Sequence, residues 1–154
     1  MPPLLLLRAA QRFAALRPEE RAFAARAWLA APVVRASLAL VGLKSTLRWV
    51  DAVPAREAPS PASSGVSVAE GGALVGGAFR THLALVARGE CLPRSMVQYL
   101  LHRRDGVPAR LVIGVKRPER GAPIEAHAWI EADPTGAEGG FTPLFATRPA
   151  GGVA

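Results

Sequence analysis

The sequence predicts an α+β fold in which helices come first and a small antiparallel sheet follows. Apolar residues recur every three or four positions through residues 4–50 and again through 73–104, which is typical of helices with one buried face. Beyond residue 109 the pattern changes to a β-branched run and then to strict alternation, which is typical of strands. A chain of 154 residues is long enough to form one domain with its own core.

The composition divides this domain into four parts. Residues 1–50 are expected to form helices that pack on the remainder, and residues 73–148 are expected to form the main core. Between them, residues 51–72 are rich in Pro, Ser, Ala and Gly and predict a long surface connection. The tail, residues 149–154, is expected to fray.

Two or three short amphipathic helices are expected within residues 4–50. The run Arg17–Glu20 indicates the start of the first, because its proline lacks the N–H that a first turn leaves unpaired and its acids favour the positive end of a helix. Pro32 is expected to end this helix. A second helix is then expected over residues 33–50.

The positive charge is concentrated in the first third of the chain. The formal net charge is +7, and residues 1–50 hold eight Lys or Arg against two acids. Such a face can be merely solvated, or it can bind nucleic acid, an anionic membrane or an acidic partner. Zinc-ligand spacing, helix-turn-helix patterns and basic stretches with interleaved aromatics are missing, so we expect no nucleic acid and favour an acidic peptide or partner protein.

The sequence shows no export signal or membrane span. Leu4–Leu7 are too few for the apolar region of a signal peptide. The most apolar stretch, Ala22–Leu43, is interrupted by two arginines and a proline, so we expect no stable membrane insertion. A single cysteine excludes an intramolecular disulfide and favours the reducing cytoplasm.

That cysteine, Cys91, is predicted to lie at the start of a helix. Residues 92–101 carry an apolar stripe, and two arginines followed by Gly106 are typical of a helix end. A lone cysteine is more often a small buried residue, but the charged neighbours Arg88, Glu90 and Arg94 favour a partly exposed, electropositive site. The positive end of a helix and a nearby imidazolium both favour the reactive thiolate.

A candidate base follows on a strand. Arg110–Val115 is a β-branched run that predicts a strand buried on both faces. Residues 126–131 alternate strictly, which puts His127, Trp129 and Glu131 on one face and the inward-packing Ala126, Ala128 and Ile130 on the other. A cysteine at a helix start and a histidine on a strand are the layout of a thiol nucleophile with its base.

The other two histidines are not expected to take part in the chemistry. His82 lies between apolar neighbours and is expected to be a surface or packing residue. His102 lies beside arginines at a helix end and is expected to be a favourable C-terminal charge. With so few scattered ligand residues and no Gly-rich phosphate loop, the sequence predicts neither a metal nor a cofactor.

The motifs together resemble the leader peptidases of lasso-peptide maturation, which are transglutaminase-like (papain-like) cysteine enzymes. The resemblance is dense over residues 88–131 and looser elsewhere. It rests on Cys91-Leu92-x-Arg94-Ser95, Leu100-Leu101-x-Arg103-Arg104-x-Gly106, Leu111–Val115 and Ala126–Glu131. It implies a Cys-His-acid triad that removes a leader peptide from a precursor, a small partner protein that binds the leader, and a cyclase that then closes a macrolactam.

The third member of the triad departs from the family pattern. The family usually places an acid on the strand after the histidine strand, roughly a dozen residues beyond the histidine, and the returning strand expected at 141–145 contains none. Glu138 is the preferred candidate. Asp133 is the alternative, although it falls in an Asp-Pro turn pattern. A third alternative is that both are turn residues and a carbonyl or amide orients His127.

The sequence therefore predicts acyl transfer to water by a cysteine peptidase. Cys91 attacks the scissile carbonyl, His127 protonates the leaving amine and later activates water, and the acid orients His127. A transglutaminase-like acyltransferase that hands the acyl group to an amine stays open, as does a non-catalytic peptide-binding module.

Overall fold

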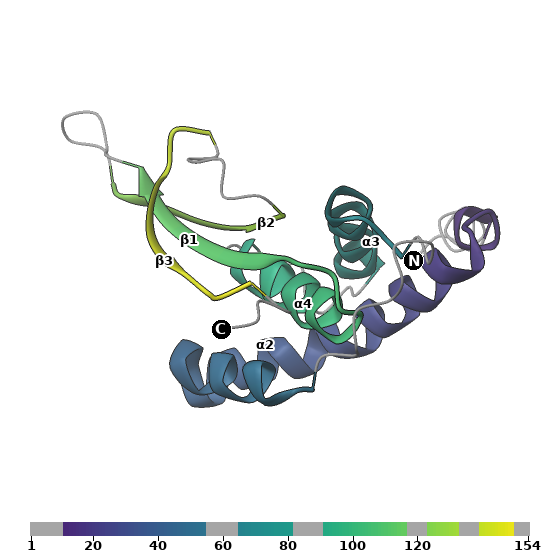
Figure 1. The fold of residues 1–154 in the computed structure, drawn as a ribbon, viewed down its shortest axis with the longest axis horizontal. Helices are drawn as coiled ribbons and strands as arrows, with labels where there is room; N and C mark the ends of the chain where they lie inside the picture. The colour runs from purple at the N-terminus through teal and green to yellow at the C-terminus, as the bar shows by residue number, and fades with distance from the viewer. Residues whose placement is uncertain (1–10, 55–64, 82–90, 117–122, 133–138, 150–154) are drawn as a thin grey trace.

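The computed structural model describes residues 11–54, 65–81, 91–116, 123–132 and 139–149. The elements, in chain order, are α2 (Pro18–Ala52), α3 (Val68–Thr81), α4 (Cys91–Arg104), β1 (Arg110–Lys116), β2 (Glu125–Glu131) and β3 (Thr142–Ala146). Helix α4 lies between the other two helices and the sheet (Figure 1). This separation of helices from an antiparallel sheet is the α+β arrangement that the sequence predicts.

Helix α2 continues through Pro32 and breaks at Gly42, which corrects the expected division into two helices. Gly42 has φ 75° and ψ 175°, a conformation that is inexpensive only for glycine. Pro32 is exposed, so its ring lies on the outer side of α2 rather than in the core. Beyond the break, Thr46 and Trp49 both hydrogen-bond to the Ser37 hydroxyl at 2.9 Å, which holds the two parts together.

The inner side of α2 forms the core together with α3 and α4. Phe23, Ala27, Ala31 and Val34 are 0% exposed and follow the helical spacing that buries one face. They pack in one cluster with buried side chains of the other elements: Val75, Phe79, Met96, Val97, Tyr99, Leu101, Leu111 and Ala128.

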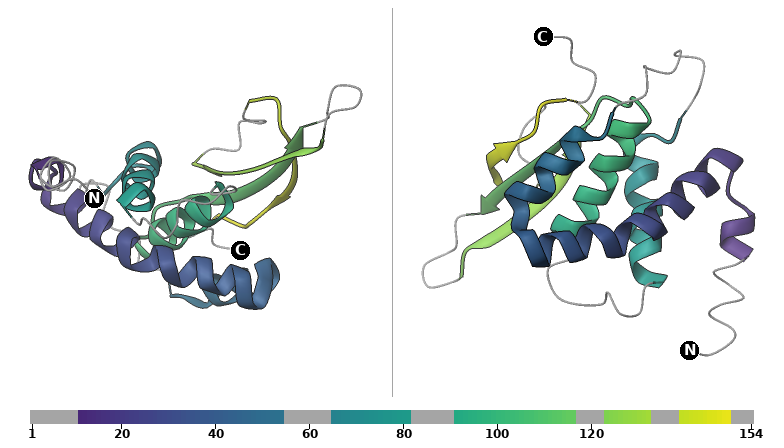
Figure 2. Two further views of the ribbon diagram at one scale, coloured as in Figure 1. Left: turned by 180° about the vertical axis from the view of Figure 1, so that it is seen from behind. Right: turned by 90° about the horizontal axis from the view of Figure 1, so that it is seen from below.

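The outer side of α2 is apolar and exposed. Leu29, Val33 and Leu40 are 63%, 59% and 82% exposed, and the right panel of Figure 2 looks onto α2 from this side. By length and composition alone, α2 is long and apolar enough to cross a membrane. The interrupting arginines therefore do not rule out a membrane span, contrary to our expectation. Only 17% of the most apolar stretch of α2 is buried in the fold. A spanning α2 would have to withdraw its inner face from the core, so the absence of stable insertion stays our prediction.

Helix α3 begins at Val68, so the connection before it is shorter than the predicted 51–72. Ser67 and Glu70 cap its start reciprocally: the Ser67 N–H donates to the Glu70 carboxylate at 2.8 Å, and the Glu70 N–H donates to the Ser67 hydroxyl at 3.3 Å. The part of the connection at residues 55–64 lies outside the described residues.

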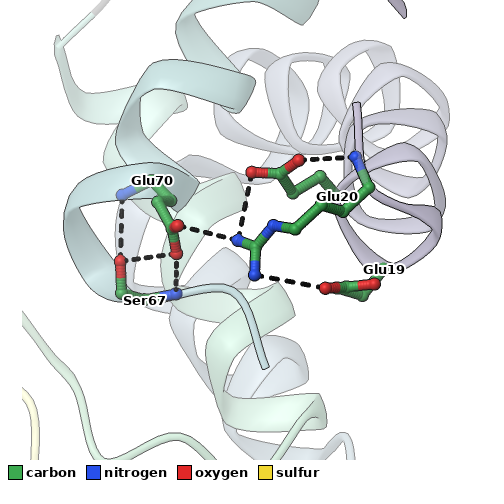
Figure 3. A network of polar contacts seen from close by, with 5 residues as sticks. Glu19, Glu20, Ser67 and Glu70 are labelled. Atoms are coloured by element: carbon green, nitrogen blue, oxygen red, sulfur yellow. Dashed lines mark hydrogen bonds and ion pairs between the residues drawn. The ribbon is translucent and has the colours of Figure 1, made fainter. Parts of the chain in front are cut away.

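Arg17 joins the starts of α2 and α3. Its guanidinium contacts Glu20 at 3.1 Å and Glu70 at 2.7 Å, as well as Glu19 at 3.2 Å (Figure 3). The hydrogen bond from Arg17 holds the pKa of Glu20 below its usual value. Exposed ion pairs contribute little stability, so their main consequence is to fix where the two helices meet.

Helix α4 has both ends where the sequence predicts them. Gly106 has φ 73°, and the N–H groups of Gly106 and Val107 donate to the carbonyl groups of Arg103 and His102 at 3.1 and 2.9 Å. This pair of bonds is a Schellman cap. The cap turns the chain back at once toward β1.

His102, in the last turn of α4, is 0% exposed, which corrects the expectation of a charged residue at the helix end. Helices α2 and α3 cover the side of α4 on which it lies: its ring is 5.2 Å from that of Phe23, and a Cβ on Gly71 would lie 2.5 Å from its Nε2. Burial lowers the pKa of His102 to about 4, against the attraction of Asp105. The ring is therefore neutral at neutral pH.

The sheet has the strand order β2-β1-β3, with both pairings antiparallel. Gly114 of β1 pairs with His127, and Arg110 pairs with Glu131. Strand β3 lies one residue later than the expected 141–145 and pairs with β1, with a register shift between Ile113 and Gly114. The strand that follows the histidine strand in sequence is therefore not its neighbour in the sheet.

Candidate active site

Cys91 is the first residue of α4 and is half-buried. One turn later, the hydroxyl of Ser95 donates a hydrogen bond of 2.8 Å to the carbonyl oxygen of Ala128 in β2. Ala128 directly follows His127, and β2 is an edge strand. The cysteine helix is therefore tied, one turn after Cys91, to the histidine strand within one residue of His127.

The direction of the two elements places both functional residues at the same end. Helix α4 ends only six positions before Arg110, whose partner in the sheet is Glu131, the last residue of β2. The ends of α4 and β2 therefore lie together, and the two run side by side in one direction (Figure 1). Both are about 21 to 23 Å long, because a helix rises 1.5 Å and a strand about 3.3 Å per residue. Their starts, with Cys91 and His127, therefore lie at the same end of the pair, and β2 extends beyond the start of α4.

His127 lies in an aromatic cluster. Its ring stacks against that of Trp129, with centroids 6.0 Å apart and an angle of 14° between the planes. Phe141 packs against the same imidazole at 5.2 Å and against the indole at 6.5 Å. Two flat walls therefore limit how the imidazole can turn.

A polar network fixes the indole on which the imidazole stacks. Trp129 donates from Nε1 to Glu131 at 2.8 Å. The other carboxylate oxygen of Glu131 accepts from Nε and Nη2 of Arg110 at 2.9 and 2.6 Å. Trp129 and Glu131 are only 5% and 8% exposed, and hydrogen bonds to charged groups are strong when water is excluded.

Gly114 provides the space for this arrangement. A Cβ there would lie 2.8 Å from the indole of Trp129 and 2.7 Å from the backbone oxygen of Thr142. The sequence placed His127, Trp129 and Glu131 on one face correctly, but it did not reveal that Arg110 and Gly114 complete the cluster. The only available signal was the glycine inside a β-branched run, which indicates a close approach of other atoms.

The opposite face of β2 agrees with the sequence only in part. Ala128 is buried and Ile130 packs on the core, as expected. Ala126 is exposed, so the expectation that it packs inward is wrong. The reason is that β2 extends beyond the start of α4, so the helix does not cover its first residues.

The family of the chain follows from its sequence match. Residues 33–146 match the family model described as the transglutaminase-like superfamily. The chain belongs to the transglutaminase-like superfamily. The match runs from the middle of α2 to the end of β3 and so includes the whole candidate site. No curated protein and no solved structure matches the chain.

Superfamily members include cysteine peptidases and acyltransferases, and this chain has the cysteine and histidine that such chemistry needs. Cys91 and His127 are not hydrogen-bonded to each other in the structure, which is common because catalytic pairs often close this bond only when substrate is bound. The histidine cluster and the cysteine helix are instead brought together by the Ser95 bond to β2.

No described acid forms a hydrogen bond or ion pair with His127. Glu138 and Asp133 both lie outside the described residues, so their assignment stays a prediction. Two described acids lie on the histidine strand: Glu125 is exposed, and Glu131 binds Trp129 and Arg110. Glu131 therefore affects the His127 imidazole only indirectly, by holding the Trp129 indole on which that imidazole stacks.

Within the described ranges, no group of His, Cys, Asp and Glu has the arrangement of a metal site. A hollow of about 420 Å³ lies elsewhere, between the end of α2, the middle of α4 and the end of β3. Tyr99 lines it and donates from its hydroxyl to Asp51 at 2.9 Å. This hollow is not lined by Cys91 or His127.

Proposed function

We propose that the protein is a cysteine peptidase that removes the leader from a lasso-peptide precursor, with Cys91 as nucleophile and His127 as general acid and base. The observation that carries the chemistry is the Ser95 bond to Ala128, which supports placing the helix start that bears the thiol beside the strand that bears the imidazole. The specificity for a lasso precursor is supported by the resemblance of the motifs over residues 88–131.

The reaction runs in two acyl transfers. The Cys91 thiolate attacks the scissile carbonyl carbon, and the tetrahedral intermediate collapses to a thioester as His127 gives a proton to the leaving amine. His127 then takes a proton from water, which attacks the thioester and releases the acid and the thiol. The N–H of Cys91 has no acceptor within the helix, so it can donate to the oxyanion.

The same proposal names the partners and the place of action. A small leader-binding protein presents the precursor, and a macrolactam cyclase uses the released core peptide, in the cytoplasm. The genes beside this one should therefore encode a short precursor, a leader-binding protein and an asparagine-synthetase-like cyclase.

The second candidate is an acyltransferase, because the superfamily match supports it as well as it supports a peptidase. It uses the same thioester but gives the acyl group to an amine. Incubating the protein with precursor, leader-binding protein and a primary amine distinguishes them by product mass. If the masses of the two products add up to the precursor plus one water, the protein is a peptidase. If one product carries the added amine as an amide, the protein is an acyltransferase.

The nucleophile is tested by Cys91→Ala. The variant should lose all leader removal, with a melting temperature within about 2 °C of wild type, because a half-buried small thiol makes little contribution to the core. His127→Ala should lose cleavage as well, with Arg104→Gln, at the far end of α4, as an unaffected control. Cleavage at the wild-type rate by the Cys91 variant rejects the mechanism.

A further inference from the structure

Two guanidinium groups lie side by side beside the start of α4. A Cβ on Gly76 of α3 would lie 2.6 Å from Nη2 of Arg94 and 3.4 Å from Nη1 of Arg80. Arg94 belongs to the first turn of α4 and Arg80 to the last turn of α3. The two cations therefore share the space above one buried glycine, where two helices pack together.

This pair lies next to Cys91. Arg94 follows Cys91 by three positions, so the two side chains are neighbours on one helix face. Side chains on a helix also lean toward its N-terminus, which tilts Arg94 toward the thiol end of α4. The N-terminus itself carries the positive end of the helix dipole. The thiol consequently has cationic groups on the side that faces α3.

No described acid forms an ion pair with Arg80 or Arg94. Three other described arginines do form ion pairs with carboxylates: Arg17 with Glu19, Glu20 and Glu70, Arg26 with Asp105, and Arg110 with Glu131. Two like charges held close together repel, and an anion bound between them removes that repulsion. Paired guanidinium groups are also the side chains that best match the two oxygens of a carboxylate.

We propose that Arg80 and Arg94 form a subsite for a carboxylate beside Cys91, and that it holds an Asp or Glu side chain of the peptide substrate close to the scissile bond. The identity of the ligand as a peptide rests on the proposed function. The presence of an anion site beside the thiol does not. Gly76 is the residue that allows the two guanidinium groups to approach.

The anion site is tested by alkylating Cys91 with iodoacetate and with iodoacetamide. The two reagents differ mainly in one negative charge, and the chain has one cysteine, so the reaction reports on Cys91 alone. Relative to N-acetylcysteine amide, Cys91 should favour iodoacetate by about five-fold or more, the effect of one charge pair roughly 7 Å apart at an effective dielectric constant of about 50. The preference should shrink in 0.5 M NaCl.

Variants separate the pair from other charges. Arg94→Gln and Arg80→Gln should each lower the preference toward that of the free thiol. Arg104→Gln, which removes an equal charge at the far end of α4, should leave it unchanged. Gly76→Ala keeps both charges but displaces the Arg94 guanidinium, so it should weaken the preference while retaining the fold.

Three results overturn the proposal. The first is a preference equal to that of the free thiol. The second is a preference that Arg80→Gln and Arg94→Gln leave intact, which assigns it to the helix end alone. The third is a preference that emerges only after Glu90→Gln, which means that the chain neutralises the pair itself.

A peptide series then tests the ligand. Replacing each acidic residue of a cleaved peptide by its amide should raise KM about ten-fold at one position near the scissile bond, with kcat nearly unchanged, and Arg94→Gln should abolish this difference. A C-terminally amidated peptide should behave like the free acid, because the subsite takes a side chain. Equal KM values for acid and amide peptides overturn the substrate assignment. If Cys91 prefers iodoacetate but the protein cleaves no peptide, the anion site is supported and the proposed peptidase function is rejected.

Discussion

Replacing Gly114 by alanine should destabilise the sheet and disturb His127 in one step. The added Cβ would lie 2.8 Å from the Trp129 indole and 2.7 Å from the backbone oxygen of Thr142. The backbone of a paired strand cannot move away as a flexible side chain can, so either β3 or the indole must shift. Overpacking of this kind costs about 1–3 kcal/mol. For a domain of this size that loss lowers the melting temperature by roughly 2–12 °C.

The matched control is the same change at Gly77 in α3. A Cβ there would have only the end of the Arg80 side chain near it, at 3.9 Å. Alanine is the better helix former by about 0.5–1 kcal/mol. The identical chemical substitution should therefore raise stability at Gly77 and lower it at Gly114.

Circular dichroism melts of the wild type, Gly114→Ala and Gly77→Ala measure whether each change raises or lowers the melting temperature. The cleavage assay measures the effect on the candidate active site. Because the indole supports the imidazole of His127, Gly114→Ala should also reduce kcat at least ten-fold at a temperature where it is fully folded. A Gly114→Ala protein that melts at or above the wild-type temperature refutes the packing described for Gly114. Normal kcat in a folded, destabilised variant refutes the role of the indole.

The remaining predictions concern the uncertain acid and two buried features of the helices. Glu138→Gln should slow cleavage by at least about 100-fold, because the orienting acid of a triad is worth up to about 10⁴ in kcat. Asp133→Asn should cost less than ten-fold, and reversed effects would make Asp133 the triad acid. Arg26→Gln breaks a part-buried bidentate pair of 2.6 and 2.7 Å with its aspartate partner and should lower the free energy of unfolding by about 1–3 kcal/mol. The exposed Arg21→Gln should change it by less than about 0.5 kcal/mol, and an equal loss for both contradicts the pairing. Burial lowers the pKa of His102 to about 4, so between pH 6.5 and 4 the unfolded chain binds more protons than the folded chain. The free energy of unfolding should therefore be highest above pH 6.5 and fall by roughly 3 kcal/mol toward pH 4. In His102→Gln, urea titrations at several pH values should show a smaller fall over that range, and an unchanged slope contradicts the assignment.

The local features of the site followed from the sequence because each is decided within a few residues. Helical spacing and a Gly106 cap located α4, including its start at Cys91. Strict alternation placed His127, Trp129 and Glu131 on one face of β2. Capping, φ preference and side-chain period act between near neighbours in the chain, so they can be recognised without knowing the fold.

The tertiary structure decided what joins distant segments. No local pattern indicated that Arg110 pairs with Glu131, which is 21 positions away, that Arg94 lies over Gly76, or that two other helices bury His102. It also did not reveal that α2 passes Pro32, because a proline usually ends a helix and only the packing of the whole helix decides whether it continues. Such contacts depend on which helix faces and strand edges meet, and that choice is made by burial of the whole core rather than by any one stretch of chain.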